Sequence, residues 1–139
     1  QDTEFDEPMD GIVYAAAAAL GLASLENVFY VFTAYLTSPA LALGTIVVRA
    51  IFSVPGHALF ANAWGYALGR AKFMAPERRP RIIIGGLLLG MALHGAFNFL
   101  LMTAEIFAYT MIIFILILTP GLWILANRNI AAALRYGRQ

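Results

Sequence analysis

The chain has 139 residues, of which 61% are hydrophobic and only 12% charged, whereas soluble domains carry about 25% charged residues. A formal net charge of +1 and the lack of cysteine leave no electrostatic case for binding nucleic acid and exclude disulfides and thiolate metal sites. This composition indicates a protein whose solvent is lipid.

Residues 1–10 contain several acids and no base, the reverse of the n-region of a secretory signal peptide. They also do not begin with methionine. We therefore expect an acidic N-terminal segment that belongs to a chain longer upstream.

Four apolar segments follow, each with the roughly 20 residues that a helix needs to cross a bilayer. In lipid every backbone amide needs an internal partner, so such segments must be helical. The sequence therefore predicts an all-α, polytopic membrane bundle over residues 11–126, with spans at about 11–35, 40–71, 82–103 and 106–126.

The second segment is longer than a bilayer requires and contains Pro55 followed by Gly56. At about 1.5 Å per residue it would reach roughly 48 Å, against a hydrocarbon core of about 30 Å. Because proline removes an amide donor and bends a helix, we expect one long helix kinked at Pro55. Two half-helices are the alternative.

Most basic residues lie in the link between the second and third segments or in the tail at 127–139. They are Arg70, Lys72, Arg78, Arg79 and Arg81 in the link, and Arg128, Arg135 and Arg138 in the tail. The positive-inside rule then predicts that the link and the tail are cytoplasmic. With four spans, the acidic segment at 1–10 is expected in the cytoplasm as well.

Small residues mark the helix faces that pack most closely in lipid. His57 is followed at four-residue spacing by Ala61 and Gly65, and His94 is preceded at the same spacing by Gly90. Residues four apart share a helix face. Each histidine is therefore expected on the face that packs against neighbouring helices.

Three ionisable residues are predicted at one depth in the bilayer. Measured from the predicted cytoplasmic end of its own helix at about 1.5 Å per residue, Glu26 lies about 24 Å in, His57 about 21 Å and His94 about 20 Å. A charge this deep costs at least about 2.5 kcal/mol and marks a functional candidate. The alternative is a carboxyl group that bonds to Asn27 or to a histidine only to join helices.

Two further polar residues have less specific patterns. Asn98 follows His94 by one turn, so the two could hold a water, a metal or a developing oxyanion. Arg49 lies near the outer end of the second segment, and we expect its side chain to reach the membrane surface. Pairing of Arg49 with a carboxylate across the bundle is the alternative.

Four short stretches, in this order, resemble the PrsW family of bacterial intramembrane proteases, which is similar to the CAAX-processing endopeptidase superfamily. They are residues 6–14 (DEPMDGIVY), 21–30 (GLASLENVFY), 53–60 (SVPGHALF) and 94–98 (HGAFN). The resemblance implies a multi-pass protein of the bacterial inner membrane. It also implies cleavage of a membrane-anchored, single-span substrate such as an anti-sigma factor.

The resemblance carries over to four residues. Glu26 occupies the acidic position of the family's F-x-x-x-E motif, in which Leu22 replaces the aromatic residue. His57 matches the histidine of the family's third motif. His94 and Asn98 match the two polar residues of the fourth motif. These four residues are therefore the implied catalytic residues.

One departure from the family is serious. Its first motif, E-E-x-x-K, is absent, and Glu4, Asp6 and Glu7 do not form it. The resemblance attributes the glutamate that activates water to this motif. We therefore expect a fragment whose other half is a separate chain or has been removed, and which alone lacks its general base.

Two alternatives to a protease remain open. The first is a catalytically inactive relative that serves as a membrane scaffold or binding protein. The second is a proton relay, although a relay should have polar groups strung across the membrane rather than gathered at one level.

The cofactor is undecided between none and Zn²⁺. In one scheme Glu26, His57 and His94 hold Zn²⁺. In the other, which we favour slightly at this stage, a glutamate deprotonates water while His94 and Asn98 support the oxyanion.

Overall fold

The computed structural model describes residues 4–103 and 108–136, and every regular element among them is helical. The elements form four continuous rods. In chain order these are α1 (Pro8–Thr37); α2 (Pro39–Val48), the π-helix η1 (Arg49–Ser53) and α3 (Val54–Lys72); the 3₁₀ turn η2 (Pro76–Arg78) and α4 (Arg79–Thr103); and α5 (Ala108–Ile113), the π-helix η3 (Phe114–Leu118) and α6 (Thr119–Tyr136). The predicted all-α class is confirmed.

Three of the rods are long and apolar enough to cross a membrane, namely Pro8–Thr37, Pro39–Lys72 and Pro76–Leu101. Large apolar side chains cover their outer faces, with Phe29 and Leu36 each 71% exposed. Such a surface suits lipid and not water. The fourth predicted span, 106–126, begins outside the described residues and remains a prediction, although α5, η3 and α6 are helical.

Local signals set the ends of the first two helices. The carboxylate of Asp10 accepts the N–H of Glu7 at 2.9 Å, which caps the start of α1 directly before Pro8. At the opposite turn, the hydroxyl of Ser38 accepts the N–H of Leu41 at 3.1 Å and caps α2. A single extended residue, Ser38, therefore reverses the chain between α1 and α2.

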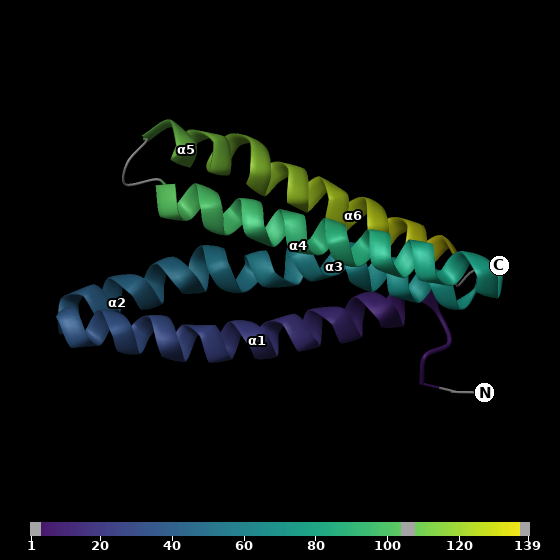
Figure 1. Ribbon diagram of the computed structural model, residues 1–139, viewed down its shortest axis with the longest axis horizontal. Coiled ribbons are helices and arrows are strands. Elements are labelled where there is room, and N and C mark those ends of the chain that lie inside the picture. Colours follow the sequence, from purple (N-terminus) through teal and green to yellow (C-terminus); the bar gives the residue numbers. More distant parts are fainter. Residues whose placement is uncertain (1–3, 104–107, 137–139) are drawn as a thin grey trace.

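The second rod runs without a break from α2 through η1 into α3, in one bent course (Figure 1). Pro55 has no N–H to give to the carbonyl one turn earlier. The turn before it is widened instead, and the N–H of Val54 bonds to the carbonyl of Arg49, five residues back. The long bent helix is confirmed and the alternative of two half-helices is wrong.

α3 is the central helix, and α1, α4 and α6 all pack against it (Figure 1). A Cβ atom built on Gly65 of α3 would lie 2.5 Å from the Cβ of Ala15 in α1. A Cβ built on Gly90 of α4 would lie 3.2 Å from the carbonyl oxygen of Phe60 in α3. The predicted small-residue rows therefore lie where the described helices pack closely, as expected for helices in lipid.

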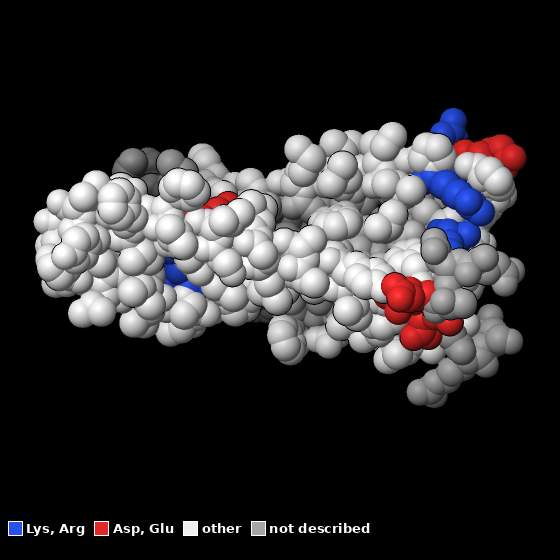
Figure 2. Space-filling model, turned by 90° about the horizontal axis from the view of Figure 1, so that it is seen from below, with Lys and Arg blue, Asp and Glu red and all other residues white. Residues whose placement is uncertain are grey.

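Charged side chains gather at one end of the molecule, with only small isolated patches elsewhere on the face shown (Figure 2). At this end α1 begins, α3 passes to α4, and α6 ends (Figure 1). Lys72 there donates to the backbone carbonyl of Phe5, and Arg79 donates to that of Met74. The arrangement fits an even number of crossings, and the assignment of this end to the cytoplasm remains a prediction.

Candidate active site

Three helices bring Glu26, His57 and His94 together inside the bundle. Glu26 comes from α1, His57 from α3 and His94 from α4. One ligand atom of each residue lies within 4.8 Å of the others, and the two imidazole centroids are 4.7 Å apart. The prediction that these groups lie at one level of the bundle is confirmed.

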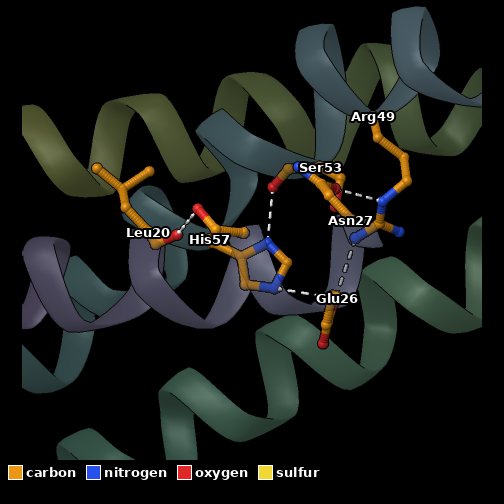
Figure 3. Close-up of polar contacts among 7 residues, drawn as sticks. Leu20, Glu26, Asn27, Arg49, Ser53 and His57 are labelled. Atoms are coloured by element: carbon orange, nitrogen blue, oxygen red, sulfur yellow. Dashed lines mark hydrogen bonds and ion pairs between the residues drawn. The ribbon is translucent and has the colours of Figure 1, made fainter. Parts of the chain in front are cut away.

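The orientation of His57 follows from its backbone partner. Nδ1 lies 2.7 Å from the carbonyl oxygen of Ser53 (Figure 3), and a carbonyl can only accept. Nδ1 therefore carries the hydrogen, and in a neutral ring Nε2 presents its lone pair. Nε2 faces Oε2 of Glu26 at 3.4 Å. Two lone pairs in this arrangement repel each other unless a proton or a cation lies between them.

The second histidine has the same feature. Within the part of the chain that the structure describes, Nε2 of His57 and Nε2 of His94 are buried without a hydrogen-bond partner. Buried polar atoms are normally paired, so these two nitrogens are candidates for binding a ligand. A carboxylate and two imidazoles form a typical donor set for catalytic zinc. The residues present therefore fit a divalent metal.

Arg49 is the other partner of Glu26. Its Nη2 lies 3.1 Å from Oε2 of Glu26, and its Nε donates to Oδ1 of Asn27 at 2.6 Å (Figure 3). Only 13% of the Arg49 side chain is exposed. The expectation that it reaches the membrane surface is wrong, because α2 packs against α1 and directs this side chain inward. The alternative, a pair with a carboxylate, is confirmed.

A cavity of about 250 Å³ opens beside the histidines between α1, α3 and α4. Its walls are mostly apolar, with Leu22 from α1, Phe60 from α3 and Met91 from α4, and both His57 and His94 line it. A volume of this size could hold several waters or part of a peptide. The cavity therefore provides space directly beside the two histidines.

Asn98 is not among the residues that line this cavity. It lies one turn beyond His94 on α4 and is half-buried. The structure thus brings three of the four sequence-predicted residues together. The proposed role of Asn98 in catalysis stays a prediction.

One buried polar contact escaped sequence reasoning. The side-chain amide of Asn129 in α6 donates to Oδ1 of Asn62 in α3 at 2.7 Å, and Asn62 is only 3% exposed. Interhelical amide bonds of this kind join membrane helices. Its sequence signal was an asparagine between Ala61 and Ala63, on a helix full of small residues.

An all-helical, multi-pass chain with a partly buried carboxylate and two histidines inside its bundle defines a membrane protein that has a candidate hydrolytic centre. Comparison with known proteins makes the class specific. The chain belongs to the PrsW family, since residues 1–123 match the family described as "PrsW family intramembrane metalloprotease". The resemblance recognised from four short motifs is therefore confirmed.

Several curated relatives are similar over most of this chain. Protease PrsW of Geobacillus kaustophilus is 39% identical over 135 residues, which cover 97% of this chain and 55% of that protein. Protease PrsW of Bacillus subtilis is 35% identical over 114 residues, covering 82% and 49% respectively. The chain thus spans about half the length of the relatives it matches. No solved structure matches it significantly.

Proposed function

We propose that this chain contributes the carboxylate and both histidines to the active site of an intramembrane endopeptidase. The observation that carries the proposal is the convergence of Glu26, His57 and His94, with two buried Nε2 atoms that have no hydrogen-bond partner among the described residues. The proposal is supported by relatives that bear the name Protease PrsW.

The facing lone pairs favour the metal scheme over the metal-free scheme that the sequence alone slightly favoured. Glu26 would hold a divalent cation through a carboxylate oxygen, and His57 and His94 through Nε2. Such a cation supplies Lewis acidity toward a peptide carbonyl and toward water.

The chain's own residues orient and enclose the site. The carbonyl of Ser53 fixes the ring of His57 with Nε2 toward Glu26. The ring of Phe60 stacks on His94, with centroids 5.3 Å apart and planes at 14°, and covers one face of the imidazole with apolar surface. Glu26 and the histidines are therefore held before substrate arrives, as catalysis by fixed groups requires.

The substrate class follows from the apolar cavity and from the family. A membrane-anchored, single-span protein such as an anti-sigma factor could bring an extended segment to the histidines through the gap between α1 and α4. With the charged end in the cytoplasm of a bacterial cell, the three residues lie past the midplane, within reach of the outer face. The general base is assigned to the E-E-x-x-K motif of the family, which these residues do not contain.

The test is cleavage of a single-span reporter substrate by the intact protein carrying His94→Ala. We expect cleavage to be abolished while expression and thermal unfolding in detergent stay unchanged. Leu88→Ala is the matched control, because Leu88 lies on the same helix with 59% of its surface exposed. Cleavage retained by the His94 variant would contradict the proposal. A wild-type protein that cleaves no reporter would favour the scaffold alternative.

A further inference from the structure

Arg49 joins α1 by three contacts made by one guanidinium group. Nη2 bonds to Glu26 at 3.1 Å, Nε bonds to Asn27 at 2.6 Å, and Cζ lies 4.1 Å from the ring centroid of Tyr30. A planar guanidinium can make two directed bonds and a ring contact at once, whereas a lysine ammonium is a point charge. The three contacts fix the guanidinium relative to the backbone of α1.

The contacts of Glu26 are divided unevenly between its two oxygens. Arg49 and His57 both approach Oε2 (Figure 3). Among the described residues, no polar partner approaches Oε1. Arg49 therefore holds Oε2 of Glu26 beside Nε2 of His57.

The π-helix η1 links this contact to the histidine. Arg49 is its first residue and Ser53 its last. The side chain at the first position holds Glu26, while the carbonyl at the last position holds Nδ1 of His57. One widened turn thus sets the directions of two of the three cluster residues, and such turns are frequent at functional sites.

We propose that Arg49 is a positioning residue that acts through Glu26 and fixes the direction of its carboxylate toward His57. The proposal rests on the proposed function of the cluster. The side chain of Arg49 contacts Glu26, Asn27 and Tyr30 on α1, so its proposed action is through Glu26. Partners that orient metal ligands in this way typically change metal affinity or activity by about 10- to 100-fold when they are removed.

The test compares Arg49→Lys and Arg49→Gln in the intact protein. We expect Arg49→Lys to keep the wild-type KM but to lose about tenfold in kcat and in Zn²⁺ affinity. Lysine keeps the positive charge, but it lacks the planar guanidinium that bonds Glu26 and Asn27 at once. Arg49→Gln should lose about 100-fold in both. Partial rescue by lysine, together with an unchanged KM, is a result that a merely structural ion pair would not give.

Two further variants keep the test decisive. Asn27→Leu leaves the Arg49–Glu26 pair and removes the second anchor, so a smaller loss of kcat is expected even if Arg49→Gln fails to fold. Thr45→Val is the matched control and should behave as wild type, because the Thr45 hydroxyl donates to the Leu41 carbonyl within α2 and to no other group among the described residues.

The outcomes separate this proposal from the proposed function. Wild-type kcat and Zn²⁺ affinity in Arg49→Lys, Arg49→Gln and Asn27→Leu, while His94→Ala abolishes cleavage, would overturn the positioning role alone. A loss confined to thermal stability would overturn it as well. If His94→Ala still cleaves, the proposed function falls, and the Zn²⁺ titration then decides on Arg49 by itself.

Discussion

At the scale of single residues, the site depends on which nitrogen of His57 carries its hydrogen. The Ser53 carbonyl takes the N–H of Nδ1, so Nε2 is left facing Glu26. Helix phase and depth could predict that His57 and His94 would meet Glu26. They could not predict this tautomer, because it depends on a carbonyl of the same turn.

Arg49 shows a second limit of sequence reasoning at this scale. Its distance from the helix end indicated a side chain that reaches the membrane surface, and that reading ignored α2 packing against α1. The direction of the Arg49 side chain decides whether it reaches the surface or pairs with Glu26. That direction depends on η1, and Pro55 indicated a bend here without indicating which way Arg49 would point. The pair with Glu26 was foreseen only as an alternative.

Asn98 and His94 share a helix face by spacing, yet only His94 lines the cavity. We therefore predict that Asn98→Ala lowers reporter cleavage by about tenfold or less, as expected for a polar group outside the reacting centre. His94→Ala in the same assay should abolish cleavage. Equal, complete loss in both variants would show that Asn98 touches the reacting groups.

At the scale of elements, close helix packing positions the cluster, and two adjacent glycines of α4 test it. A Cβ built on Gly86 would overlap the Cβ of Ala67 and lie 3.2 Å from the Ala63 carbonyl, whereas a Cβ on Gly85 meets nothing within 4 Å. We predict that Gly86→Ala lowers the free energy of unfolding in detergent by about 2 kcal/mol through overpacking. Gly85→Ala should leave it unchanged or slightly raised, and similar losses in both would refute close packing of α3 and α4.

Pro55 tests the π-helix η1. Restoring its amide with Pro55→Ala lets the turn return to α-helical spacing, which would rotate Arg49 relative to His57 by about 100° per residue. We predict a variant at least as stable as wild type, with cleavage reduced about tenfold or more. Activity at the wild-type level would mean that the widened turn does not matter for the site.

The sequence predicted the elements well where composition decides them. The apolar runs define the long rods, and the rows ending in Gly65 and Gly90 identify the contact faces. Pro55 predicted a bend, but the widened turn at η1 that accompanies the bend was not predicted. The Asn62–Asn129 bond was not predicted either, because it depends on which helices become neighbours. Local patterns carry no information about a partner 67 residues away.

At the scale of the whole molecule, the charged end distinguishes the two sides of the bundle. The chain has no cysteine, so single cysteines can report on its topology. We predict that Glu77→Cys, in the link before α4, reacts with an impermeant maleimide only from the cytoplasmic side. Ser38→Cys, at the turn between α1 and α2, should react only from the opposite side. Labelling of both variants from one side would contradict the orientation.

The central claim is that Glu26, His57 and His94 form one metal-binding centre in the bundle, and the zinc content of the purified intact protein tests it most directly. We expect stoichiometric zinc in the wild type and its loss in Glu26→Gln, His57→Ala and His94→Ala, with each variant still folded. A wild-type protein without zinc, or variants that keep all of it, would contradict the claim.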